Sequence, residues 1–110
     1  MPSISPELKR GTLEMILLNL LRERDMYGYE MILRLKESGG ETFKIEGGTI
    51  YPVLYRLQND GLIELRLQPV VSGVPRKHYH LTEEGARRAV DLVNQWKEFI
   101  AVVTRLLGPA

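Results

Sequence analysis

The sequence predicts a mainly α-helical fold with one small β-hairpin and a long final helix. Apolar residues recur at helical spacing in four segments of the 110-residue chain, whereas two segments between residues 62 and 81 alternate apolar and polar residues as strands do. Glycine and proline residues separate these segments. Helices followed directly by a hairpin are typical of a winged helix-turn-helix, which is therefore the predicted fold, with a C-terminal dimerisation helix added to it.

Composition excludes several classes of function. The chain has no cysteine, so a disulfide scaffold, a thiolate zinc site and a cysteine nucleophile are ruled out, and a cytoplasmic location is expected. The longest apolar stretch, residues 15–21, is too short to cross a bilayer, and the N-terminus lacks the pattern of a signal peptide, so no membrane partner is expected. Net charge is only +1, so nucleic-acid binding would require locally concentrated positive charge.

Asp25 separates the first two predicted helices. Ser5 can cap the first helix and Pro6 suits its first position, so we expect this helix to run to about Arg24. Asp25 breaks the apolar pattern and can cap a second helix over about residues 27–38, which two glycines end. Four residues of the second helix are expected to face the core: Tyr29, Ile32, Leu33 and Leu35.

A third helix is expected over about residues 48–60. Residues 41–46 before it alternate and could form a short strand or an extended linker. Pro52 is compatible with a helix that begins near Gly48 or Thr49, because it then lies in the first turn, where few N–H groups have intrahelical partners. The inward residues recur at i, i+3, i+4 and i+7: Ile50, Val53, Leu54 and Leu57.

A hairpin and an amphipathic helix complete the chain. Residues 62–68 and 76–81 predict the two strands, with His78 and His80 on one face of the second. Thr82 is suited to cap the last helix. Its apolar stripe occupies heptad positions a, d and e: Ala89, Leu92, Val93, Trp96, Phe99, Ile100, Val103, Leu106 and Leu107.

The polar side of the third helix is suited to enter the major groove of DNA. A helix fits that groove, and a hairpin can reach the neighbouring backbone or minor groove. Glycines would allow a close approach of the DNA backbone, and a helix N-terminus favours phosphate. The candidate contacts are Gly48, Thr49, Tyr51, Pro52, Tyr55 and Arg56. The alternative is that the glycines form a simple tight turn and the tyrosines pack at the edge of the core.

Four cations could add phosphate contacts. Arg76 and Lys77 are consecutive in the hairpin, and Lys9 and Arg10 lie near the first helix. The alternative for the hairpin pair is an ordinary solvated run of charge.

Four motifs resemble those of the PadR family of bacterial transcriptional regulators: KRGTLEMILLNLL, DMYGYEMILRL, EGGTIYPVLYRLQNDGLIE and GVPRKHYHLTEEG. The resemblance covers about residues 8–88. It implies a winged helix-turn-helix that binds operator DNA as a dimer, usually as a repressor, with the reading helix at about 48–60 and the wing at about 68–78. It also implies a small aromatic or drug-like effector and a single C-terminal helix for dimerisation, as in the shorter-tailed branch. The implied DNA contacts are Thr49, Tyr51, Pro52, Tyr55 and the wing cations.

The wing departs from the family pattern at two places. Val74 stands where many members have a glycine or an arginine, and His80 stands where many have an arginine, while His78 replaces an aromatic residue. The wing therefore carries less fixed positive charge, and we expect its affinity for DNA to be lower or sensitive to pH.

Residues 1–81 are thus expected to form the DNA-binding domain and residues 82–110 a dimerisation helix packed on it. A stripe at positions a, d and e can serve two contacts, so we infer that one edge packs on the first helix and the other on a second subunit. The predicted dimer residues are Leu92, Val93, Trp96, Phe99, Ile100, Val103, Leu106 and Leu107. Trp96 and Phe99 could also line a cavity for a small aromatic or apolar effector. The alternatives are that Trp96 anchors the core and that the whole stripe packs within one monomer.

The expected function is sequence-specific DNA-binding regulation of transcription, by a ligand-responsive repressor that binds a palindromic operator as a homodimer. No catalytic residue, cofactor or metal is expected, because the chain has two histidines and no glycine-rich phosphate loop followed by Lys-Ser/Thr. His78 and His80 could both face a metal, but no third ligand is evident. The alternative function is a dimeric winged-helix module that binds protein without specific DNA binding.

Overall fold

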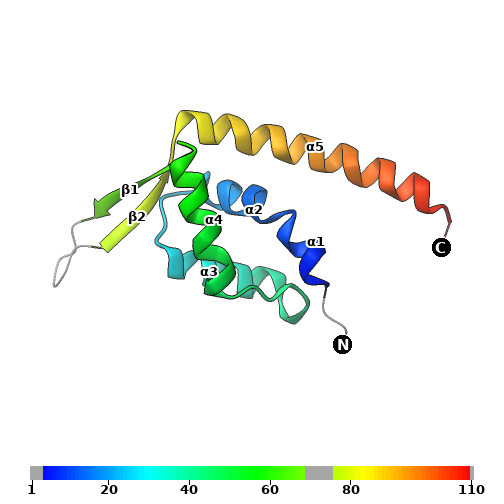
Figure 1. Ribbon diagram of the computed structural model, residues 1–110, viewed down its shortest axis with the longest axis horizontal. Helices are drawn as coiled ribbons and strands as arrows, with labels where there is room; N and C mark the ends of the chain where they lie inside the picture. The colour runs from blue at the N-terminus through cyan, green and yellow to red at the C-terminus, as the bar shows by residue number, and fades with distance from the viewer. Residues whose placement is uncertain (1–3, 69–75, 110) are drawn as a thin grey trace.

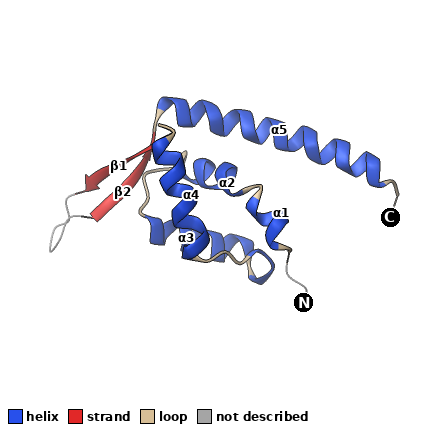
Figure 2. Cartoon of the chain, in the orientation of Figure 1, coloured by secondary structure: helices blue, strands red, loops and turns tan. Residues whose placement is uncertain are grey.

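The computed structural model describes residues 4–68 and 76–109, and this part of the chain is mainly helical with one hairpin (Figures 1 and 2). The predicted fold class is therefore confirmed, whereas the tip of the predicted wing lies outside the described residues. The elements follow in the order α1 (Pro6–Arg10), α2 (Leu13–Leu21), α3 (Gly28–Gly39), a 3₁₀ turn (Glu41–Phe43), α4 (Gly47–Asn59), β1 (Ile63–Gln68), β2 (Arg76–Leu81) and α5 (Glu83–Leu107).

The core forms around α2, which contacts α4, α5 and β2. Leu17 and Leu18 of α2 are completely buried. The four residues of α4 that were predicted to face inward are all buried, so this part of the helical pattern is confirmed. Beyond α2 and α4, the core takes in Met26, Met31, Leu35, Ile63 and Ala89.

β1 and β2 pair in antiparallel register, with Ile63 opposite Leu81 and Leu65 opposite Tyr79. His78 and His80 share the other face, as predicted. Outside this hairpin, Met26 forms an isolated antiparallel bridge with Tyr79 on the free edge of β2. The connection between α2 and α3 thus adds one residue of a third strand to the sheet.

The first predicted helix is interrupted. Instead of running from Pro6 to Arg24, it divides into α1 and α2 at Gly11 and Thr12, and α2 ends at Leu21. The backbone N–H and the hydroxyl of Thr12 both donate to the carbonyl of Lys9, which closes a tight turn at the end of α1. The predicted start is correct, because the Ser5 side chain accepts from the N–H of Leu8 and Pro6 opens the helix.

The prediction for the second helix was wrong in its cap and in part of its inward face. The N-cap of α3 is Tyr27, while the Asp25 side chain bonds to His80. Tyr29 and Leu33 are exposed, whereas Gly28, Met31 and Leu35 are buried. Both faces fit a 3.6-residue period, so packing against α4 and the sheet decides between them.

The segment before α4 and the position of Pro52 also differ from prediction. Residues 41–43 form the 3₁₀ turn rather than a strand. α4 begins at Gly47, so Pro52 is its sixth residue and lies in the second turn rather than the first. Pro52 has no N–H to donate to the carbonyl of Gly48, four residues earlier, and both residues are exposed, so water can satisfy that carbonyl.

α5 starts against the corner between α4 and β1 and continues past α2 and α1 (Figure 1). Thr82 caps it as predicted, because its hydroxyl oxygen accepts from the N–H of Gly85 at 3.0 Å. Arg88 of α5 forms an ion pair with Glu14 of α2 at 3.4 Å. Among the described helices, none is long and apolar enough to cross a membrane.

Gly85→Ala is expected to lower the free energy of unfolding by about 2 kcal/mol, because a Cβ there would collide with the carbonyl oxygen of Leu62. Urea denaturation measures this change. Gly11→Ala is the matched control, since a Cβ at Gly11 would meet no atom closer than 4.0 Å and its φ of −66° suits alanine. Equal stability of the two variants would contradict the inferred packing of α5 on the corner.

Candidate nucleic-acid interface

The edge of α4 opposite the core is exposed and carries the candidate DNA contacts of this helix. Gly48, Pro52 and Tyr55 lie along it, about 100° per residue around the helix, and Arg56 flanks it. Tyr55 is 67% exposed, and a Cβ at Gly48 would meet nothing within 4 Å. The structure thus brings together most of the α4 residues that the sequence nominated, along one exposed edge of the helix.

Tyr51 differs from Tyr55 because its ring packs on two glycines. A Cβ at Gly28, at the start of α3, would lie 2.6 Å from the Tyr51 ring, and a Cβ at Gly47 would lie 3.3 Å from it. The ring is still 46% exposed. Burial, together with the nearby Tyr51, raises the pKa of Tyr79 above its usual value of 10.0. Tyr51 therefore packs α4 against the start of α3, which corresponds to the alternative in which this tyrosine packs at the edge of the core.

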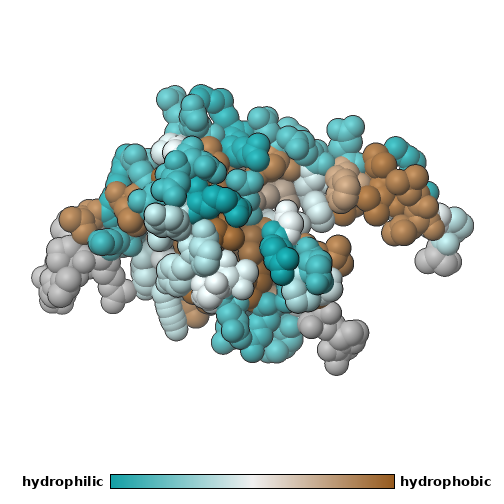
Figure 3. Space-filling model, viewed as in Figure 1, coloured by the Kyte–Doolittle hydropathy of each residue, from teal (hydrophilic) through white to brown (hydrophobic). Residues whose placement is uncertain are grey.

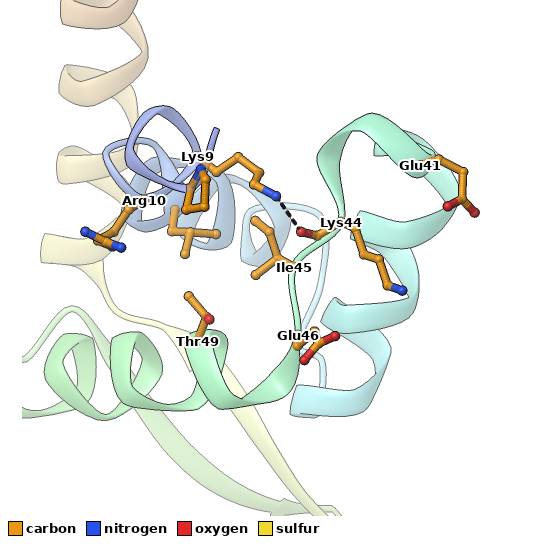
Figure 4. Close-up of a pocket in the computed structure, with 9 residues that line it drawn as sticks. Lys9, Arg10, Glu41, Lys44, Ile45, Glu46 and Thr49 are labelled. Carbon is orange, nitrogen blue, oxygen red and sulfur yellow. Dashed lines mark hydrogen bonds between the residues drawn. The ribbon is translucent and has the colours of Figure 1, made fainter. Parts of the chain in front are cut away.

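A polar pocket of about 420 Å³ lies on the other flank of α4 and includes Lys9, Arg10 and Thr49 (Figure 4). The Lys9 ammonium donates to the carbonyl of Lys44 at 2.9 Å, so it ties α1 to the segment before α4. Glu46 also lines the pocket, so the pocket contains both positive and negative side chains. Arg10 and Thr49 both line this pocket, and Arg10 forms no ion pair within the described residues.

Ion pairs distribute the positive charge unevenly. Five arginines contact carboxylates within 4.0 Å, and none of the five belongs to α1 or α4: Arg24, Arg34, Arg66, Arg87 and Arg88. Within the described residues, no carboxylate pairs with Arg10 or Arg56. Arg22 and Arg105 also form no ion pair within the described residues, but they lie on α5 or at the end of α2. Arg10 and Arg56 are thus the described arginines outside ion pairs that belong to α1 and α4, although the net charge of the chain is only +1.

The hairpin has two described lysine or arginine side chains, and Arg66 of β1 is paired with Glu64. Lys77 is exposed on β2, and it forms no ion pair within the described residues. Arg76 begins β2, but its side chain is outside what the structure describes, as are Val74 and the rest of residues 69–75. Of the predicted wing, the structure therefore describes the strands β1 and β2 but not the tip that connects them.

Both histidines of β2 contact residues in or just before α3, which the sequence did not predict. Nδ1 of His80 is 2.8 Å from Oδ1 of Asp25, and the His78 ring packs edge-on against Tyr27 with centroids 5.5 Å apart. Glu30 is close by: burial raises its pKa, but hydrogen bonds from Arg24 and from the Tyr27 N–H outweigh burial, so the pKa is lowered from 4.5. Within the described residues, no three histidine or carboxylate side chains are grouped as metal ligands.

A second, apolar groove of about 870 Å³ runs between α5 and the α1–α2 pair. Trp96 and Phe99 both line it, with ring centroids 6.4 Å apart. From Phe99 onward most of the α5 stripe is exposed, and Figure 3 shows apolar side chains gathered at this end of the helix. Leu106 and Leu107, at the end of the stripe, are 80% and 78% exposed, so they are barely covered by the described residues.

Comparison with known proteins shows which family this chain resembles. Residues 17–91 match the transcriptional regulator PadR-like family. A Lysinibacillus sphaericus protein named uncharacterized protein X is 32% identical over 100 residues, which cover 91% of this chain and 92% of that protein. The negative transcriptional regulator PadR of Bacillus subtilis (strain 168) is 30% identical over 79 residues; these cover 72% of this chain but only 43% of that longer protein.

Solved structures agree with the fold. The crystal structure of a PadR-like transcriptional regulator from Bacillus cereus strain ATCC 14579 has a TM-score of 0.81 and 33% identity, covering 94% of this chain and 99% of that one. A PadR family regulator from Eggerthella lenta DSM 2243 has a TM-score of 0.80 and 38% identity, covering 94% and 88%. The chain therefore belongs to the PadR-like family of transcriptional regulators, which are DNA-binding proteins rather than enzymes.

Proposed function

We propose that this regulator acts in the cytoplasm as a homodimer, binds a palindromic operator in double-stranded DNA, represses transcription and responds to a small apolar effector. The exposed edge of α4 carries the proposal. One edge of this helix is buried while Pro52 and Tyr55 project from the other, and Arg10 and Arg56 form no ion pair within the described residues. A helix held in this way can enter the major groove and direct its side chains to base edges.

Phosphate contacts on both flanks of α4 would set its register on the duplex, since such contacts position a protein without reading sequence. Arg10 and Thr49 supply them on one flank, and Lys77 with Arg76 supplies them from β2. Lys9 is used differently, because its ammonium group already bonds to Lys44. It supports the segment before α4, and Arg10 carries more of the DNA contact.

The exposed half of α5 supports the homodimer. The radius of gyration is 15.7 Å, whereas a compact domain of this length has about 13 Å. The difference reflects the projecting end of α5, where Phe99, Leu106 and Leu107 are exposed. A second copy of the chain would cover this apolar surface, and a two-fold axis would then relate the two α4 helices.

Repression and the effector rest on separate observations. The Bacillus subtilis relative is named a negative transcriptional regulator, which favours repression. The groove beside Trp96 and Phe99 has a mainly apolar lining that suits a flat apolar molecule. Because the same groove adjoins the proposed dimer surface, a ligand there would alter how the two subunits pack.

Selection of bound duplexes from a random DNA pool is expected to enrich a palindrome with half-sites about 34 Å apart, one turn of DNA. Affinity for the selected duplex should fall steeply between about 50 and 200 mM salt, and Arg10→Ala should reduce the salt slope by about one unit. Lys9→Ala is the matched control and should change the slope less. Failure to enrich any sequence, with binding that is insensitive to salt, would favour the protein-interaction module instead.

The two tyrosines of α4 should behave differently. Tyr55→Ala is expected to lower affinity for the selected duplex about tenfold and to leave the free energy of unfolding within about 0.5 kcal/mol of wild type, because Tyr55 is mostly solvated. Tyr51→Ala should lower affinity and also cost about 1 kcal/mol of stability, because it removes the ring packed on two glycines. Fluorescence anisotropy and urea denaturation measure the two quantities. Tyr55→Phe separates the hydroxyl from the ring, and undiminished binding by Tyr55→Ala would remove this residue from the interface.

Charge placed on the distal stripe of α5 should dissociate the dimer. Phe99→Glu and Leu106→Glu are each expected to convert the dimer into a 12.6 kDa monomer at micromolar concentration, because each buries a charge at the apolar contact. Sedimentation equilibrium measures the mass. Val102→Glu is the control, since Val102 lies on the same helix outside the stripe. A wild-type chain that sediments as a monomer would refute the dimer.

A further inference from the structure

β2 is joined to the helical body by few polar contacts. The N–H of Tyr79 donates to the carbonyl of Met26 at 2.8 Å, and the N–H of Met26 donates back at 3.3 Å. Because this bridge is antiparallel, the residues beside it also face each other. Asp25 lies opposite His80, and Tyr27 lies opposite His78.

The two histidines contact the body in different ways. Nδ1 of His80 lies 2.8 Å from Oδ1 of Asp25, and the imidazole must donate because a carboxylate only accepts. Nε2 of His78 is 3.8 Å from Glu30, too far for a hydrogen bond, and Nδ1 of His78 is buried without a partner among the described residues. Of the two histidines, His80 is therefore the one with a hydrogen bond from its ring to the helical body among the described residues.

Neighbouring charges do not replace this contact. Glu64 lies opposite His80 across the hairpin, but its carboxylate pairs with Arg66 at 2.7 Å. Both residues belong to β1, so their ion pair lies within the hairpin and does not connect it to the helical body. Arg24 pairs with Glu30 at 2.7 Å within the helical body. Among these ion pairs, the Asp25–His80 pair is the one that joins body to hairpin at hydrogen-bond distance.

We propose that Asp25 and His80 are positioning residues for DNA recognition, which hold β2, and with it Lys77, at a fixed place relative to α4. This inference rests on the proposed DNA-binding function. A two-stranded hairpin is marginally stable alone, and contacts from a wing help only if the wing lies at the correct distance from the reading helix. Asp25 and His80 would set that distance without touching the duplex.

The direction in which Asp25→Ala changes the affinity for DNA distinguishes a positioning role from a simple electrostatic effect. A carboxylate near a DNA interface repels phosphate, so removal of its charge alone should strengthen DNA binding. If Asp25 positions β2, Asp25→Ala should instead weaken binding to the selected duplex by about three- to tenfold, a range discounted for partial exposure of the pair. Asp25→Asn keeps an acceptor oxygen for the imidazole and should restore most of the affinity. Glu64→Ala, the matched control on the same face, should leave affinity unchanged or raise it.

A second measurement tests the anchor without DNA. In Asp25→Ala, amide hydrogen exchange at Tyr79 and Met26 should accelerate relative to the core amide of Leu17, while Asp25→Asn and Glu64→Ala keep the wild-type ratio. Imidazole ¹⁵N spectra should show the proton of His80 on Nδ1 in the wild type and not in Asp25→Ala.

The outcomes are separable. Unchanged exchange, or unchanged or tighter DNA binding, in Asp25→Ala overturns the positioning role. If the wild-type chain binds no duplex at all, the DNA-binding proposal fails and the role in recognition fails with it. The exchange ratios then still decide whether the pair anchors β2.

Discussion

Burial of one edge of α4 against α2 is the constraint on which the rest of the structure depends. Ile50, Leu54 and Leu57 are completely buried, and each contributes about 1.5–3 kcal/mol when fully removed from water. Rotation of the helix about its axis would forfeit more free energy than a few surface contacts could return. The orientation of Pro52 and Tyr55 toward solvent is therefore fixed before any ligand arrives, and the surrounding elements are placed relative to this helix.

The two flanks of α4 are held by different physical means. On one flank, the Tyr51 ring fills the space left by Gly28 and Gly47, so α3 and α4 approach closely. At this point the two helices are held together mainly by packing of the ring. On the other flank, the ammonium of Lys9 reaches a backbone carbonyl and leaves Arg10 without a carboxylate partner. The first flank is held by ring packing, while on the second Arg10 forms no ion pair within the described residues, and a guanidinium group binds phosphate well.

Sequence patterns predicted the features that depend only on residues close together in the chain. The Ser5 and Thr82 caps, the inward edge of α4 and the alternation of the strands followed from residue type and spacing. The inward face of α3 did not follow from residue type and spacing, because apolar residues lie on two faces of this helix with the same helical period. In addition, the closest contact of α3 is made at Gly28, which has no side chain to reveal it. The partner of Asp25 lies 55 residues away, so local pattern suggested a helix cap where the structure has a bond to the hairpin. The candidate DNA-contact residues of α4 stay a prediction, and the different environments of Tyr51 and Tyr55 could be seen only in the fold.

The junction between β2 and α5 determines how a dimer would present α4. β2 ends at Leu81 and α5 begins at Glu83, so Thr82 alone separates them. The Thr82 hydroxyl donates to the carbonyl oxygens of Gly61 and Leu62, which locks this residue to the corner after α4. Without a flexible linker, the direction of α5 and the position of α4 are mechanically coupled. Any dimer formed through the distal half of α5 therefore fixes the separation of its two α4 helices, and a change in the packing of that half would be transmitted to the DNA-facing edges.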